Sequence, residues 1–246
     1  MARSARASPL PKPPGLHLRR YLTRWRTDPF WAVRYLFADM AEFFGEALVC
    51  VRGERQVFAG VEFRLASGGA LILAGPNGAG KSSLLRLMAG LAPAAGGVIV
   101  WDRTPIADDP DAHRARLHYV GHLDAVKPTL TVAENVAYAA ELRGAPAARP
   151  LLAQALSRFG LEALADLPAR YLSQGQRRRT ALARLLAAPG ELWLLDEPTL
   201  ALDAAAHDAL AAALAAHRRD GGMVVAATHA PIALADAATL DLGAAR

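Results

Sequence analysis

The sequence predicts an α/β fold, and three observations support this. The chain has 246 residues, enough for one large domain with a buried core. Apolar segments of strand length end directly before polar or glycine-rich turns, at residues 71–74, 117–120 and 192–195. Segments with helical spacing of apolar residues follow these turns. Strands that alternate with helices favour a sheet that is mainly parallel.

Composition limits the classes of partner. Residues 1–39 hold eight Lys and Arg against two Asp, a net charge of +6, whereas residues 40–246 hold 20 basic and 21 acidic groups, a net charge of −1. The main domain therefore has no excess of positive charge, and we expect no nucleic-acid partner. Cys50 is the only cysteine, which excludes a disulfide framework and a thiolate metal site. It lies in an apolar segment and is expected to be a small buried residue in a reducing compartment.

Four interpretations of residues 1–39 stay open. The first fourteen residues are rich in Pro, Ser, Ala and Arg, which is typical of disorder. Residues 16–37 mix Arg with Tyr, Trp and Phe and suit a membrane surface or a partner. An Arg-rich, acid-poor start also resembles an organellar targeting segment. Alternatively, translation begins at Met40. No segment is apolar and long enough to predict a transmembrane helix.

A glycine-rich turn joins the strand at 71–74 to a helix that starts at Lys81. Glycines permit backbone angles that turn successive N–H groups inward, which forms an anion site at a helix N-terminus. Lys81 adds positive charge toward the β- and γ-phosphates of a nucleotide, and the Ser82 hydroxyl suits Mg²⁺. An ordinary glycine-rich turn is the alternative, but the strand before it and the helix after it favour phosphate binding. The segment comprises Gly75, Pro76, Asn77, Gly78, Ala79, Gly80, Lys81, Ser82 and Ser83.

Further elements follow from the same patterns. We expect strands at 47–51 and 61–65 before the glycine-rich turn, and another at 98–101 after its helix. The polar, Asp-rich segment 102–116 is predicted to be a surface connection. The strand at 117–120 then leads directly into Gly121 and His122.

A second polar group follows the apolar strand at 192–195. Asp196 and Glu197 lie at its carboxyl end, where ligands collect in doubly wound sheets. An Asp in this position can hold Mg²⁺, and the next carboxylate can orient or deprotonate an attacking water. A solvated acidic pair is the alternative, but a phosphate-binding turn upstream favours the catalytic interpretation.

A second anion site is predicted near Ser173. This serine is placed as the N-cap of a helix that runs to about Ala188. A serine hydroxyl, the flexible Gly175 and the helix N-terminus together suit a phosphate. The three arginines at 177–179 could be no more than a solvated face.

Six ordered motifs over residues 47–242 give the chain a resemblance to ABC-type ATPases. Residues 1–39 lie outside this resemblance. Leu-Ser-Gln-Gly-Gln at 172–176 is similar to the signature motif, residues 195–198 to Walker B with its glutamate, and residues 200–203 to the D-loop. Ala-Thr-His, ending at His229, follows a strand at 223–226 and resembles the switch histidine. The resemblance implies a P-loop NTPase of ABC type. Such a fold has a RecA-like mixed or parallel sheet, an antiparallel β subdomain and a helical subdomain near 131–169.

The resemblance also implies a mechanism in which two copies of the chain pair head to tail and hydrolyse ATP. Lys81 and the loop amides would hold phosphate, while Ser82 and Asp196 would bind Mg²⁺. Glu197 would be the base for water, and His229 would stabilise the γ-phosphate. The residues that reach across to the partner's nucleotide would be Ser173, Gly175 and Gln176.

Two positions depart from the common pattern. His122 stands where most ABC transporters have a glutamine, and Arg52 stands where an adenine-stacking aromatic is expected. A guanidinium plane can also stack on adenine. Two roles for His122 stay open: it binds Mg²⁺, or it responds to contact with the permease. Both departures, with the string at 50–55, resemble the ATP-binding subunit of the haem exporter of cytochrome c maturation.

That resemblance implies a subunit without a pore, held at the cytoplasmic face of the inner membrane by separate permease subunits. Docking would use residues 131–169 and the region near His122, and haem would not touch this chain. Three alternatives predict different features. An ABC subunit for another substrate keeps every catalytic assignment. A soluble ABC ATPase would have tandem ATPase halves or long coiled coils, and a small-molecule kinase would not need the signature helix.

Overall fold

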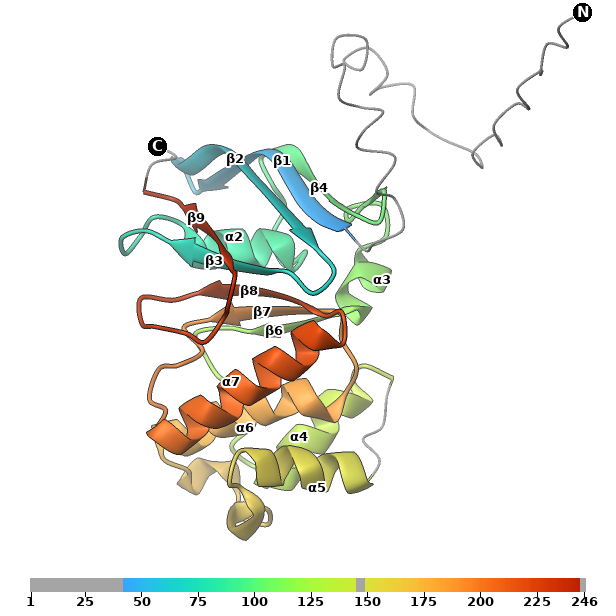
Figure 1. The fold of residues 1–246 in the computed structure, drawn as a ribbon, viewed down its shortest axis with the longest axis vertical. Coiled ribbons are helices and arrows are strands. Elements are labelled where there is room, and N and C mark those ends of the chain that lie inside the picture. Colours follow the sequence, from blue (N-terminus) through green and yellow to red (C-terminus); the bar gives the residue numbers. More distant parts are fainter. Residues whose placement is uncertain (1–41, 145–148, 244–246) are drawn as a thin grey trace, which may run out of the picture. The chain divides into compact units, whose positions relative to one another are not determined.

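The computed structural model describes residues 42–144 and 149–243, which form two sheets and a set of helices (Figure 1). These residues belong to one compact unit, 41–246. The expectations for residues 1–39, including a start at Met40, lie outside the described residues. In the ranges that the structure describes, no helix is long and apolar enough to cross a membrane.

The first sheet is antiparallel and has the strand order β2-β1-β4-β5. A tight turn with Gly53 at a φ of 60° joins β1 to β2, so that Arg52 pairs with Arg55. Both strands are longer than the sequence patterns predicted, because their outer positions are polar. The strands are β1 (Glu42–Arg52), β2 (Arg55–Ala66), β4 (Gly96–Trp101) and β5 (Thr104–Pro105).

The second sheet is parallel and has the order β6-β7-β8-β3-β9. Every residue of β7 and of β8 is buried, which explains why both read as continuous apolar runs. β3 lies between β8 and β9, two strands from the last quarter of the chain. The strands are β3 (Ala70–Ala74), β6 (Leu117–Val120), β7 (Leu192–Asp196), β8 (Met223–Ala227) and β9 (Ala238–Asp241).

Side-chain oxygens cap the larger helices. Thr131 and Glu134 form a capping box at α4, Ser173 and Gln176 form another at α6, and Asp203 caps α7. The α-helices are α2 (Lys81–Met88), α3 (Pro110–Ala115), α4 (Val132–Glu141), α5 (Arg149–Arg158), α6 (Gln174–Ala187) and α7 (Ala204–Arg219). Two short 3₁₀ turns are η3 (Glu162–Leu164) and η4 (Ala169–Tyr171).

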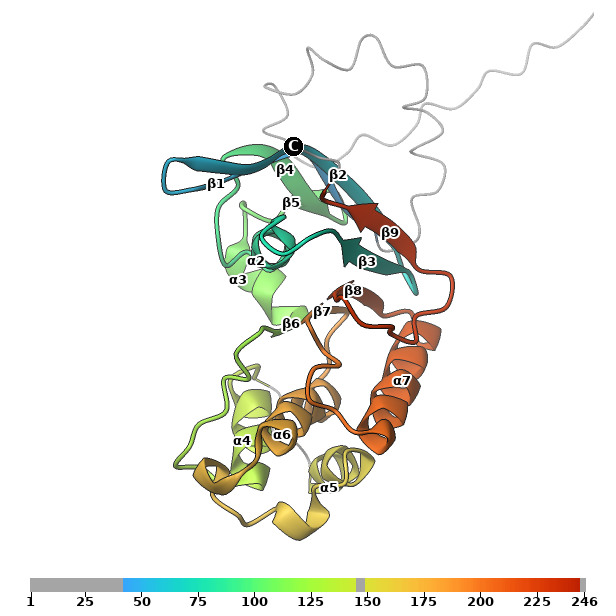
Figure 2. The same ribbon diagram turned by 90° about the vertical axis from the view of Figure 1, so that its left-hand side faces the viewer.

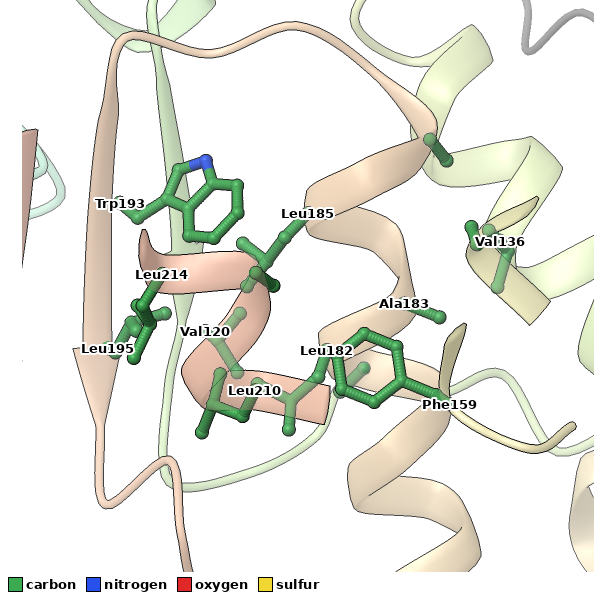
Figure 3. Close-up of a cluster of buried hydrophobic side chains, with 14 of the residues drawn as sticks. Val120, Val136, Phe159, Leu182, Ala183, Leu185, Trp193, Leu195, Leu210 and Leu214 are labelled. Carbon is green, nitrogen blue, oxygen red and sulfur yellow. The ribbon is translucent and has the colours of Figure 1, made fainter. Parts of the chain in front are cut away.

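Two hydrophobic cores cover the two faces of the parallel sheet. Side chains alternate along β7, so Trp193 and Leu195 join one core while Leu192 and Leu194 join the other. The first core packs against helices α4 to α7, and Figure 3 shows Phe159 beside Leu182 and Ala183 of α6. The second core contains α2 and the inner face of the antiparallel sheet (Figure 2). Cys50 belongs to it, 4% exposed, as expected from its apolar neighbours.

The segment 102–116 differs from the prediction of a plain surface connection. It contains β5 and the short helix α3, which begins after Asp109 because that carboxylate accepts from the amide of Ala112. Pro110 occupies the first helical position, where no amide hydrogen is needed. His113 is buried and its Nε2 lies 2.8 Å from the carbonyl of Met88 at the end of α2. Because its neighbours in the segment are charged and exposed, the sequence pattern did not reveal that the side chain of His113 points inward.

Candidate functional site

The phosphate loop lies between the end of β3 and the start of α2. Pro76, Asn77 and Gly78 are exposed, so the loop is open to a ligand. Gly80 precedes α2 with a φ of 105°, a left-handed conformation that side chains strongly disfavour. A Cβ atom there would lie 2.8 Å from Phe58 of β2. The antiparallel sheet therefore packs against the loop so closely that only glycine fits.

Lys81 lies inside this loop with 8% of its surface exposed. Its ammonium donates to the carbonyls of Gly75 at 2.7 Å and Pro76 at 3.1 Å. It also lies 2.9 Å from Nε2 of His229, 148 residues away in sequence. Because an ammonium can only donate, Nε2 accepts and this contact requires a neutral imidazole. Lys81 and His229, both predicted as site residues, are thus in direct contact.

Asp196 and Glu197 lie at the carboxyl end of β7, next to the same loop. Asp196 is 3% exposed and pairs in register with Ala227 of β8. Glu197 has a φ of 47°, and its amide donates to the carbonyl of Ala227 at 2.8 Å. This turn sends its carboxylate toward His229, with 3.9 Å between Oε1 and Nε2. The order β7-β8-β3 therefore gathers the two predicted catalytic residues and Lys81 at one edge of the sheet.

Arg178 is the site residue that sequence reasoning missed. It is 4% exposed, whereas Arg177 is exposed and Arg179 is half-buried. Its guanidinium donates to the carbonyls of Asp196 and Glu197, both at 2.6 Å. It also donates to the carbonyl of Gly121 at 3.0 Å and to the carboxylate of Asp124 at 2.9 Å.

This guanidinium joins α6 to the ends of β6 and β7. The proposal that all three arginines are a solvated face is wrong for Arg178. A signal was present in the sequence: Arg178 has the same helical spacing as the buried Ala181, Leu182 and Leu185. Its backbone partners come from distant segments, which no local pattern reveals.

The signature segment lies apart from the phosphate loop. Ser173 caps α6 and its Oγ accepts from the amide of Gln176 at 3.3 Å, as predicted. Gly175 lies against the carbonyl of Ala201, where an added Cβ would be only 2.7 Å away. Within residues 42–144 and 149–243, no hydrogen bond or ion pair links residues 173–176 to the phosphate loop. The two segments predicted to bind anions are therefore not bonded to each other within the described chain.

The two departures occupy exposed positions. Arg52 ends β1 beside the hairpin turn, and His122 follows β6 and lines a cavity with α4 and α6. In the part of the chain that the structure describes, neither makes a hydrogen bond or ion pair with Lys81, Glu197 or His229.

The oxygen donors near the loop suit a magnesium ion that retains water. Asp196 offers a buried carboxylate and Ser82 a half-buried hydroxyl at the start of α2. Among the described residues, no group of three or more His, Cys, Asp or Glu side chains could hold a metal. Mg²⁺ commonly binds through one carboxylate, substrate phosphates and water rather than a full protein cage. The residues present fit that mode.

Fold and site together define a P-loop ATPase. Residues 58–200 match the family model described as ABC transporter. The chain is 57% identical over 202 residues to the cytochrome c biogenesis ATP-binding export protein CcmA of Paramagnetospirillum magneticum, covering 81% of this chain and 93% of that protein. It is 56% identical to the CcmA protein of Rhodospirillum rubrum, covering 82% and 86%.

A solved dimeric ATP-binding cassette, bound to ADP and phosphate after hydrolysis, is 26% identical with a TM-score of 0.67. The match covers 76% of this chain and 88% of the solved cassette. The chain belongs to the ABC transporter family of ATPases, in the group of CcmA-type cytochrome c biogenesis ATP-binding proteins. The predicted fold class is confirmed, and a small-molecule kinase is excluded.

Proposed function

We propose that this chain is the ATP-hydrolysing subunit of a haem exporter for cytochrome c biogenesis. The observation that carries the proposal is the identity of more than half over most of the chain to two cytochrome c biogenesis export proteins. The ATPase domain comprises residues 40–246, with a helical subdomain near 131–169. The subunit works at the cytoplasmic face of the inner membrane, attached to separate permease subunits.

The working unit is a pair of chains. The phosphate loop of one copy and residues 173–176 of the other enclose each ATP. A head-to-tail pair would bring together two anion sites that do not meet within one chain. The Ser173 cap takes the amide of Gln176, so a γ-phosphate would accept hydrogen bonds from the amides of Gln174 and Gly175 at the start of α6. Closure of the pair on ATP then moves the permease subunits.

Hydrolysis uses the group of side chains at the carboxyl ends of β7 and β8. Lys81 exchanges His229 for the phosphates when ATP enters, since its ammonium now donates to that imidazole. Glu197 takes a proton from water, which attacks the γ-phosphate, and His229 hydrogen bonds that phosphate. Mg²⁺, held by Ser82 and Asp196, would neutralise charge that develops on the phosphates.

Arg178 is a positioning residue in this scheme. It fixes the carbonyls of Asp196 and Glu197, and it ties them to Gly121 next to His122. His122 belongs to the surface that meets the permease, and Arg52 lies beside the adenine. Haem stays with the membrane subunits and does not touch this chain.

Complementation tests the proposal. The chain is expressed in a bacterium that lacks its own CcmA-type subunit, and haem-stained c-type cytochromes are measured. We expect restored cytochromes with the wild-type chain and none with Glu197→Gln. Permease subunits should co-purify with both proteins. A wild-type chain that is folded, hydrolyses ATP and yet restores no c-type cytochrome would refute haem export and favour an ABC subunit for another substrate.

A further inference from the structure

The turn that carries His229 starts where β8 ends at Ala227. The side chain of His229 is 49% exposed, so close packing does not hold its ring in place. Its Nε2 nevertheless lies 2.9 Å from the ammonium of Lys81. Side chains inside a core are fixed by the atoms packed around them, whereas an exposed ring takes its direction from its backbone. The position of this ring therefore depends on the conformation of the turn.

The hydroxyl of Thr228 closes this turn. Thr228 directly precedes His229 and is 8% exposed. Its Oγ1 accepts from the amide of Ala230 at 3.0 Å and donates to the carbonyl of the same residue, also at 3.0 Å. Pro231 follows, and a residue before proline is restricted to extended conformations. The backbone on both sides of His229 is therefore fixed by one buried hydroxyl.

Two hydrogen bonds join the same turn to Glu197. The amide of Glu197 donates to the carbonyl of Ala227 at 2.8 Å. The amide of His229 donates to Oε2 of Glu197 at 3.4 Å. A shift of the turn would thus move the imidazole and disturb the carboxylate beside it.

A role in stability alone is the alternative for a buried hydroxyl. The Ser67 hydroxyl is an example, since it donates to the carbonyl of Gly221 at 2.9 Å and joins the turns that precede β3 and β8. Those turns lie at the amino ends of parallel strands, whereas the site lies at the carboxyl ends. Thr228 differs from Ser67, because its bonds enclose a residue of the site.

We propose that Thr228 is the positioning residue that directs His229 toward the γ-phosphate, and that its hydroxyl thereby sets the preference of the chain for ATP over ADP. The inference rests on the proposed function for the contact between His229 and the γ-phosphate. ADP lacks this phosphate, so a misplaced ring lowers the affinity for ATP alone. Damage to the phosphate loop would lower both affinities, because Lys81 and the loop amides also bind the β-phosphate.

Equilibrium binding of ATP and of ADP to the full chain tests the proposal. Glu197→Gln is used as the background to prevent turnover, with Mg²⁺ present and at concentrations where light scattering shows a monomer. Thr228→Val keeps the shape of the side chain and removes the hydroxyl. We expect the affinity for ATP to fall about tenfold, as for loss of a hydrogen bond to a charged group, while that for ADP changes less than about twofold. Thr228→Ser should recover most of the preference for ATP.

Two further variants separate positioning from stability. Ser67→Ala removes a hydroxyl at the opposite end of the parallel sheet and should leave both affinities unchanged. His229→Ala should lose the preference for ATP, and the double variant with Thr228→Val should lose no more than His229→Ala alone. A ring that is absent cannot be misplaced, so the two losses are not additive if Thr228 acts through His229.

Equal losses for ATP and ADP, an unchanged affinity for ATP, additive losses in the double variant, or no recovery by Thr228→Ser would overturn the assignment. Thr228→Ala replaces Thr228→Val if the latter does not fold, and absence of ADP binding by both would assign Thr228 to stability alone.

The outcomes also separate this inference from the proposed function. If His229→Ala keeps its preference for ATP, the proposed role of His229 fails and the role of Thr228 fails with it. If His229→Ala loses the preference and Thr228→Val keeps it, only the assignment of Thr228 fails. Haem export is tested independently, by the rescue of c-type cytochromes.

Discussion

Replacement of Arg178 by Met should destabilise the protein far more than its position in a basic run implies. The substitution keeps most of the apolar volume but removes a guanidinium that is 4% exposed. Three carbonyls and the carboxylate of Asp124 lose their donor. Breaking a buried ion pair from one side costs about 3–5 kcal/mol, because the remaining charge is left uncompensated. We expect a loss of about that size in the free energy of unfolding.

Urea denaturation followed by circular dichroism measures this loss, with Arg177→Met as the matched control. Arg177 is exposed, lies one position earlier on α6 and donates to the carbonyl of Arg170, its one side-chain hydrogen bond among the described residues. Its replacement should change the unfolding free energy by less than about 1 kcal/mol. Arg178→Lys, which retains charge but not the planar fork, should fall between the two. Equal losses for the two Met variants would refute the role assigned to Arg178.

Four further results are expected. Glu197→Gln should bind ATP, accumulate as a dimer in size-exclusion chromatography and lose turnover, and undiminished hydrolysis would remove Glu197 as the base. Gly80→Ala should weaken binding of a fluorescent ATP analogue by about tenfold or more, since a Cβ would press on Phe58 and strain the loop; unchanged affinity would contradict the close packing. His122→Gln should alter ATPase activity only when permease subunits are present, and an identical permease-coupled rate would exclude a coupling role. The pKa of His118 is lowered from 6.5 to about 4, so its neutral form stabilises the fold above pH 6.5. That stability, about 3 kcal/mol, should be lost as the pH falls from 6.5 toward 4, and His118→Phe should flatten this part of the stability profile.

The local features of this protein could be predicted from sequence. The strand before Gly75, the helix that starts at Lys81 and the Ser173 cap each depend on residues within one short segment, and the structure has all three. The first half of β1, which precedes the strand predicted at 47–51, and the helix α3 were missed, because polar residues on their exposed faces hide a buried minority. His113 is the clearest example.

Contacts between distant segments could not be predicted in this way. Lys81 meets His229, and Arg178 meets Gly121, only because the sheet order places their segments side by side. The burial of Arg178 depends on carbonyls at the ends of two other elements, β6 and β7. A single sequence contains the residues for these contacts but not the order of strands that brings them together.

The strand order also has a consequence for the way the chain is made. β3 precedes the phosphate loop, yet both of its neighbours, β8 and β9, come from residues 223–241. During synthesis the loop thus leaves the ribosome long before the strands that flank it. Pairing across such a separation is slow, because a long loop must close before any contact forms. Because the phosphate loop follows β3 directly, we expect it to reach its folded conformation only after the last strands have docked.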